Sequence, residues 1–244
     1  MNGDLNFNIE CWYKPGCSLY APMCHKTCHR YLEMNFLITN CGQPDAHRYI
    51  KQIVPDKNDI KAYKRLDEIK TNVVSFVSNG SNLYIVSEKL RNGKTTWALK
   101  IMYRYFDEIW AGNGFNVRGY FVHVPELLTR LKTYSYRETE EYKYMDYNIK
   151  NSDLVVWDDI SSMELYPNDQ NILNTYIGRR LQNSKSNIFT GYKLGEALKS
   201  QVGELLSKRI QSSEIVEFVC DGRTPEENAL KVAEQIAKKN RKTI

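Results

Sequence analysis

Short apolar runs alternate along the chain with longer stretches in which hydrophobic residues recur every three or four positions. The runs have the length of strands, whereas the periodic stretches each carry one apolar face, as at Trp97, Ala98 and Met102. Runs of strand type fall at residues 82–87, 117–122, 154–157, 187–190 and 215–219, and periodic stretches at 94–105 and 172–181. This alternation predicts a three-layer α/β fold with a mainly parallel five-stranded sheet.

The remaining segments set the domain organisation. Residues 133–150 are rich in Tyr, Glu and Lys, and we expect a long surface loop there. A terminal helix is expected from Thr224, because Thr-Pro-Glu-Glu is a favourable helix start. We therefore divide the chain into a small cysteine-rich module at 1–50, a polar, lysine-rich linker at 51–72 and a second domain at 73–244.

Composition places the chain among globular proteins of mixed charge. It has 244 residues, 42% of them hydrophobic, and a net charge of +5, which excludes disordered, collagen-like and disulfide-dense classes. No apolar run reaches the roughly 18 residues that span a bilayer, and no signal peptide is visible. Five of the six cysteines fall between Cys11 and Cys41. We therefore expect reduced thiols, a cytoplasmic location, no membrane partner and a clustered metal site.

The segment between the first strand and the following helix carries a phosphate-binding pattern. A phosphate loop needs inward-facing backbone N–H groups, a helix N-terminus, a lysine for the β and γ oxygens and a hydroxyl for magnesium. Gly93, Lys94 and Thr95 supply the second half of this pattern, but Glu88 and Arg91 stand where glycines are usual. The residues expected to bind ATP are Asn92, Gly93, Lys94, Thr95, Thr96 and Asp158. Gly-Lys-Thr alone also fits an ordinary helix start.

The strand at 154–157 ends in two adjacent acids, Asp158 and Asp159. In a phosphate-loop fold this strand ends beside the nucleotide, so Asp158 and Thr95 are expected to hold hydrated Mg²⁺. Asp159 is expected to be catalytic, because it can polarise the attacking water. The alternative is a strand followed by an acidic turn. His123, which also follows a strand, is expected to be a packed or capping residue.

Four cysteines near the N-terminus form a set that can close tetrahedrally around Zn²⁺. They are Cys11, Cys17, Cys24 and Cys28. Their spacing is not the common Cys-x2-Cys knuckle, and Cys41, His25 or His29 are competing donors. Buried free thiols and an iron–sulfur cluster are the alternatives. We expect structural zinc, because a short module with so few large apolar residues needs a cross-link to fold.

Together these motifs resemble the AAA+ ATPases of the helicase-loader group, the DnaC/DnaI type, and especially their phage-encoded versions. Residues 177–180 (IGRR) and 187–192 (NIFTGY) are similar to the family's Arg-rich helix and sensor 1 strand. Residues 201–210 (QVGELLSKRI) are similar to its arginine-finger segment, and the cysteines followed by 30–34 (RYLEM) to phage loaders. The resemblance implies an AAA+ P-loop NTPase fold preceded by a zinc-binding module that contacts the helicase.

The resemblance also implies an activity, its partners and one further catalytic residue. The expected function is ATP- and Mg²⁺-dependent delivery of a DnaB-type replicative helicase onto single-stranded DNA during DNA replication. A phage-encoded protein would do this in the host bacterial cytoplasm. Self-association through the ATPase domain would bring Arg209 to a neighbour's nucleotide, with Arg179 and Arg180 as reserve candidates.

Three departures from the family pattern leave other functions open. The phosphate loop lacks its leading glycines, Tyr192 stands at the sensor 1 position in place of Asn or Thr, and Asp159 stands in place of the more frequent Glu. ATP binding is therefore a firmer expectation than fast hydrolysis. The alternatives are a nucleotide-gated, non-hydrolysing adaptor or helicase inhibitor, and a transposition regulator ATPase of the IstB kind.

Overall fold

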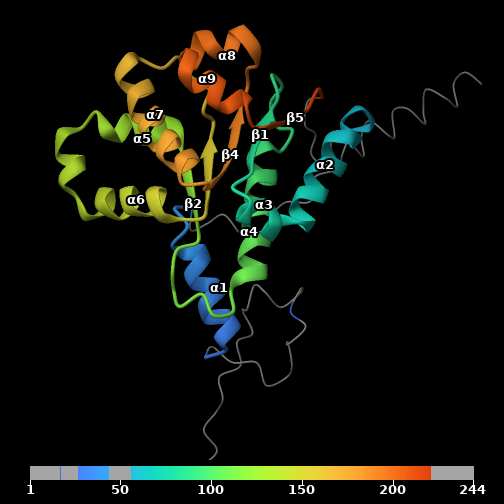
Figure 1. Ribbon diagram of the computed structural model, residues 1–244, viewed down its shortest axis with the longest axis vertical. Helices are drawn as coiled ribbons and strands as arrows, with labels where there is room; N and C mark the ends of the chain where they lie inside the picture. Colours follow the sequence, from blue (N-terminus) through green and yellow to red (C-terminus); the bar gives the residue numbers. More distant parts are fainter. Residues whose placement is uncertain (1–16, 18–26, 44–55, 221–244) are drawn as a thin grey trace, which may run out of the picture.

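The computed structural model describes residue 17 and residues 27–43 and 56–220. Strands and helices alternate through most of this part of the chain (Figure 1). The strands are β1 (Asn82–Val86), β2 (Gly119–His123), β3 (Leu154–Asp158), β4 (Ser186–Gly191) and β5 (Glu214–Glu217). The α-helices are α1 (His29–Thr39), α2 (Ile60–Thr71), α3 (Val73–Ser78), α4 (Lys94–Ile109), α5 (Val124–Leu131), α6 (Glu140–Asn151), α7 (Pro167–Gln182), α8 (Gly195–Val202) and α9 (Glu204–Gln211). The 3-10 helices are η3 (Lys57–Asp59) and η4 (Tyr134–Glu138).

The five strands form one sheet in the order β2-β3-β4-β1-β5, and every pairing is parallel. β1, β3 and β4 are central, and their side chains are buried almost throughout, as is usual when helices cover both faces of a parallel sheet. In a parallel sheet all the carboxyl ends lie at one edge. The register places His123 at the end of β2 directly opposite Asp158 at the end of β3. The predicted α/β class and five-stranded sheet are confirmed.

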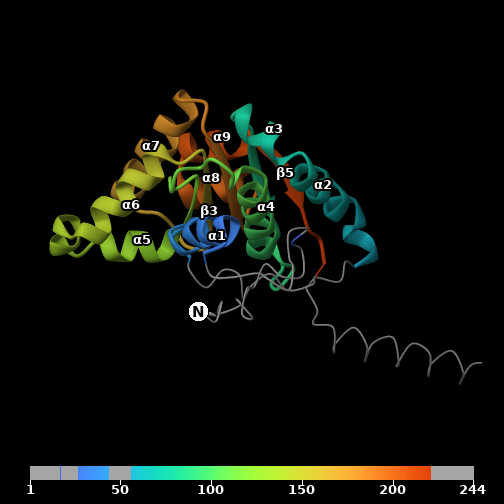
Figure 2. The same ribbon diagram turned by 90° about the horizontal axis from the view of Figure 1, so that it is seen from below.

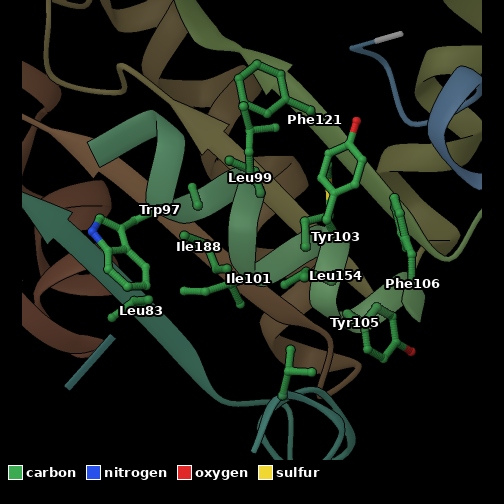
Figure 3. Packing of buried hydrophobic residues seen from close by; sticks show 14 of the residues in the cluster. Leu83, Trp97, Leu99, Ile101, Tyr103, Tyr105, Phe106, Phe121, Leu154 and Ile188 are labelled. Carbon is green, nitrogen blue, oxygen red and sulfur yellow. The ribbon is translucent and has the colours of Figure 1, made fainter. Parts of the chain in front are cut away.

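Helices cover the sheet in two layers, each with its own apolar core (Figure 2). Alternate strand residues point to opposite faces, so Leu83 packs with α1–α4 whereas Tyr84 packs with α5–α9. Figure 3 shows the first core, in which Trp97 of α4 lies beside Leu83 of β1 and Ile101 of α4 lies beside Ile188 of β4. The long helix α4 follows the phosphate loop directly, so its packing fixes the position of that loop.

The expected loop at 133–150 is wrong, because this segment forms η4 and α6. Thr139 caps α6, and its hydroxyl accepts a hydrogen bond from the backbone N–H of Tyr142 at 3.1 Å. Met145 and Ile149, one helical turn apart, are the buried hydrophobic residues of α6 and join the second core. The helical pattern was hidden because the buried stripe is narrow and the other positions carry Tyr, Glu and Lys.

The linker expected at 51–72 also needs correction over its described part. Residues 60–71 form α2, in which Leu66 and Ile69 are buried in the first core, against α4. α1 joins the same core through Met34 and Leu37, so the described part of the first fifty residues also packs on the α/β layers. Most of α2 is polar because only one narrow stripe of it faces the protein. The terminal helix expected from Thr224 lies outside the described residues.

Cys41 and Gly42, which follow α1, lie beside β2, one of the two outer strands of the sheet. The backbone N–H of Phe121 donates to the carbonyl oxygen of Cys41 at 2.6 Å. Gly42 follows with φ +81, and a Cβ there would lie 2.5 Å from the Phe121 carbonyl oxygen, so only glycine suits this close approach. None of the described helices is long and apolar enough to cross a lipid bilayer.

Candidate nucleotide site

The phosphate-loop residues lie between β1 and α4, at the carboxyl edge of the sheet. Residues 87–93 form the loop, and Gly93 adopts φ +87 as the residue that precedes the first turn of α4. Arg91 is also in the left-handed region, at φ +58, a conformation that costs energy for a residue with a Cβ. The loop therefore leads directly to the N-terminus of α4, although it lacks the leading glycines of the usual pattern. That end of α4 exposes N–H groups that suit an anion.

Lys94 is buried inside the loop. Its Nζ donates to the carbonyl oxygen of Lys89 at 3.1 Å and to Asn92 Oδ1 at 3.3 Å. It also lies 4.2 Å from the centre of the Tyr192 ring, in a cation–π arrangement. Burial lowers the pKa of Lys94, while the charges of Asp159 and Asp158 oppose that shift. The loop oxygens that now accept from Lys94 are chemically similar to phosphate oxygens, so a bound phosphate can replace them.

Asp158 accepts two hydrogen bonds from threonine hydroxyls. Thr95 Oγ1, in the first turn of α4, donates to Asp158 Oδ1 at 2.8 Å. Thr190 Oγ1, on β4, donates to the same oxygen at 2.7 Å. The structure thus brings together the hydroxyl and the carboxylate that were expected to hold magnesium. A hydroxyl and a fixed carboxylate at a phosphate loop are a suitable oxygen set for a hydrated Mg²⁺ ion.

Asp159 follows β3 in the left-handed region, at φ +58. Its backbone N–H donates to Thr190 Oγ1 at 2.9 Å, which helps to hold this conformation. Burial and the neighbouring Asp158 raise the pKa of the Asp159 carboxyl, and a hydrogen bond with Tyr192 partly counteracts them. A carboxylate with a raised pKa is a better proton acceptor, so Asp159 is suited to polarise a water molecule.

The sequence did not assign Thr190 or His123 to this site. Thr190 contacts Asp158 and the backbone of Asp159. Tyr192, which was assigned to the sensor 1 position, lies over Lys94. His123 precedes α5, but it makes no side-chain capping hydrogen bond; its Nδ1 lies 3.7 Å from Asp158 Oδ2 instead. Asp158 raises the pKa of His123. His123 lies on β2 and Thr190 on β4, the two strands that neighbour β3. Only knowledge of the strand order could therefore have indicated these two residues.

Asn92 and Thr96 complete the predicted ATP-binding set. Asn92 is buried, and its amide nitrogen donates to the Lys89 carbonyl oxygen at 3.2 Å, so it braces the loop. Thr96 lies in the first turn of α4 beside Thr95 and is partly buried. These positions are those that a phosphate loop requires of residues around Gly93.

The three arginines that were candidates for contact with a neighbour's nucleotide have different surroundings. Arg209, on α9, donates from one guanidinium nitrogen to the carbonyl oxygen of Asn174 at 2.6 Å and to its Oδ1 at 3.0 Å. Arg180 is 1% exposed. It donates to the carbonyl oxygens of Ile149, Ser152, Asp153 and Ser186 and to Asn187 Oδ1. Arg180 is therefore wrong as a reserve candidate, because its guanidinium is buried and holds the end of α6 to β4. Arg179, in contrast, is exposed.

Only part of the predicted zinc set lies among the described residues. Cys28 is the residue before α1, and Cys17 Sγ accepts a long hydrogen bond from Arg30 at 3.9 Å. Cys11 and Cys24 lie outside the described residues, as does His25. Of the competing donors, Cys41 is fully buried in the first core and burial raises the pKa of its thiol to about 12, which disfavours the thiolate that binds a metal. His29 pairs with Glu33 at 3.0 Å.

The fold is similar to the folds of several solved replication proteins. No protein-family model and no curated protein matches the sequence. A DnaC helicase loader structure is similar with a TM-score of 0.58 and 23% identity, over 70% of this chain and 98% of that one. A DnaI structure has a TM-score of 0.53 and 21% identity, over 72% and 93%. The replication initiator DnaA bound to AMPPCP and single-stranded DNA has a TM-score of 0.54 and 16% identity, over 70% and 49%.

These likenesses define the fold class. The chain shares the fold of DnaC and DnaI structures, the type that its motifs indicated. Such low identities establish architecture alone, and function has to be argued from the site.

Proposed function

We propose that this protein is an ATP-dependent loader that delivers a DnaB-type replicative helicase onto single-stranded DNA during replication. The observation that carries the proposal is the contact of Thr95 with Asp158 at the N-terminus of α4. It supports a magnesium–nucleotide site at the end of a phosphate loop. The fold shared with a DnaC helicase loader supports the role in replication initiation.

Each residue of the site has a role in this proposal. Lys94 neutralises the β- and γ-phosphates, and Thr95 and Asp158 hold the magnesium ion, which supplies charge neutralisation at the phosphates when bound. Asp159 polarises the attacking water. Arg209 of a neighbouring copy contacts the γ-phosphate when the chains self-associate through their ATPase domains.

The first test compares ATP affinity and helicase capture. Lys94→Ala removes the ammonium group from the loop and is expected to weaken ATP binding at least about tenfold. Lys100→Ala, on the same helix beside the Trp97 ring, is the matched control and is expected to bind ATP like wild type. Wild-type protein is expected to retain a DnaB-type helicase in a pull-down. The proposal fails if wild-type protein binds no ATP even at millimolar concentration.

A non-hydrolysing, nucleotide-gated adaptor or helicase inhibitor is the second candidate. It is favoured by the unusual loop, in which Arg91 occupies a left-handed position and Lys94 is already saturated by loop oxygens. Steady-state ATP hydrolysis with and without single-stranded DNA separates the two functions, because only the loader is expected to turn ATP over. Capture of a transposase in place of the helicase would indicate the IstB-like alternative.

We further propose one structural zinc ion held by Cys11, Cys17, Cys24 and Cys28. The clustering of these four cysteines within eighteen residues supports it. Elemental analysis of purified protein is expected to give about one zinc per chain, and Cys24→Ser is expected to lower it without loss of ATP binding. Folded protein without metal, or with iron and a visible chromophore, would contradict this proposal.

A further inference from the structure

Three side chains of residue types that can bind metals converge at the carboxyl edge of the sheet. His123 ends β2, and Asp158 and Asp159 end β3 and begin the turn that follows it. One potential ligand atom from each of the three lies within 4.8 Å of the other two. In the described part of the chain this is the one such group of His, Cys, Asp and Glu side chains.

The carboxylate of Asp158 is oriented so that its two oxygens have different environments. Both threonine hydroxyls donate to Oδ1, from Thr95 at 2.8 Å and from Thr190 at 2.7 Å. Oδ2 is the oxygen that faces His123, at 3.7 Å from Nδ1. Hydrogen bonds that fix a ligating carboxylate are a regular feature of metal sites. Asp158 can therefore offer Oδ2 to a cation without loss of its bonds to the hydroxyls.

His123 is accessible from solvent. Its side chain is 41% exposed, whereas that of Asp158 is 7% exposed. No side-chain hydrogen bond of His123 to the N-terminus of α5 competes for the ring. A cation can thus reach the imidazole from solvent and contact the buried carboxylate behind it.

The donor set differs from that of a typical magnesium site. Magnesium prefers an all-oxygen environment and keeps most of its water, whereas imidazole nitrogen favours transition-metal ions. Two carboxylates also concentrate negative charge here, which the Lys94 ammonium offsets in part because it interacts with both of them. The charge therefore favours a divalent cation, and the ring nitrogen favours a transition metal among such cations.

We propose that His123, Asp158 and Asp159 form a binding site for a divalent transition-metal ion of the Mn²⁺ type. The site shares Asp158 with the proposed nucleotide site. It rests on the proposed function only to this extent, because Asp158 has a part in both. The ion binds without nucleotide, and the imidazole nitrogen gives the site a preference for manganese over magnesium.

Manganese titration of the full-length protein without nucleotide tests this site. Free Mn²⁺ is followed by electron paramagnetic resonance, because manganese binds thiolates poorly and so reports little from the cysteines. Wild-type protein is expected to bind about one Mn²⁺ ion here and to release it only at a large excess of Mg²⁺. His123→Gln is expected to lower Mn²⁺ affinity at least about tenfold and to abolish the preference over Mg²⁺.

Glu126→Gln is the matched control, because Glu126 is an exposed carboxylate on α5 that pairs with Arg130 at 2.7 Å. It is expected to bind Mn²⁺ like wild type. Electron spin-echo measurements should show ¹⁴N coupling to bound Mn²⁺ in wild type and none in His123→Gln. The inference is overturned if wild type and His123→Gln bind Mn²⁺ equally or if no nitrogen couples. ATP binding with Mg²⁺, measured on the same samples, shows separately whether the proposed function holds.

Discussion

Thr190 is the residue on which the two acids of the site depend. Its hydroxyl is fully buried, donates to Asp158 Oδ1 and accepts from the backbone N–H of Asp159. One side chain therefore orients Asp158, the proposed magnesium ligand, and supports the left-handed backbone of Asp159, the expected catalytic residue. Glycine at position 159 would adopt the left-handed backbone more easily than aspartate, but it would offer no carboxylate.

We expect Thr190→Val to reduce magnesium-dependent hydrolysis and to leave ATP affinity largely unchanged. The variant keeps the volume of the side chain but leaves a buried N–H without an acceptor, at a cost of about 1–3 kcal/mol in the free energy of unfolding. ATP hydrolysis, ATP binding and urea denaturation measure the three effects. Thr175→Val, on the exposed face of α7 where the hydroxyl donates to Asn171, should change none of them. Unchanged hydrolysis in Thr190→Val would show that Thr190 does not position the acids.

The residues of the site differ in how readily the sequence indicates them. Lys94, Thr95 and Asp158 follow from motifs because each lies at a strand end or helix start that is visible in the chain itself. Thr190 and His123 carry no motif of their own. They reach Asp158 because β2 and β4 flank β3 in the sheet, and strand order is decided by packing far along the chain.

At the level of elements, the sequence indicates the strands more readily than some of the helices. The central strands β1, β3 and β4 were predicted because strands buried on both faces are rich in apolar residues. The helices α2 and α6 were not, because each buries a narrow stripe and presents charged or tyrosine side chains elsewhere. Both nevertheless contribute to the cores on which the phosphate loop rests.

The role of α2 in the core can be measured. We expect Leu66→Ala to lower the free energy of unfolding by about 2–5 kcal/mol, because Leu66 is fully buried and its loss leaves a cavity. Chemical denaturation checks this. Ile60→Ala, at the start of the same helix where the residue is 41% exposed, should cost far less. Equal, small effects would show that α2 behaves as the linker that the sequence suggested.

At the scale of the whole molecule, Arg209 is the residue whose proposed role requires a second copy. Within one chain it bonds to Asn174 and lies across Gly178, where a Cβ would come within 2.8 Å of its guanidinium. The absence of a side chain at position 178 therefore makes room for it. Release from Asn174 would be needed before Arg209 could reach a neighbour's γ-phosphate.

A mixing experiment tests this role. Arg209→Ala is expected to keep ATP binding but to lose hydrolysis that depends on self-association, and Lys94→Ala to lose binding. A mixture of the two should regain part of the hydrolysis, because an intact phosphate loop can then face an intact arginine. Lys208→Ala, which removes an exposed ion pair with Glu204, should hydrolyse ATP like wild type. If the mixture stays inactive although each variant assembles with wild type, Arg209 does not act between chains.

The backbone hydrogen bond between Phe121 and Cys41 also bears on how copies of this chain can aggregate. Outer strands of a sheet expose unpaired backbone groups to which a strand of another molecule can add. On β2 the Phe121 N–H is already taken by Cys41. On the opposite side, β5 is only four residues long and has glutamate at both ends, and short, charged outer strands resist such addition. Among the described residues, both outer strands of the sheet therefore offer little free backbone to which a strand of another copy could add.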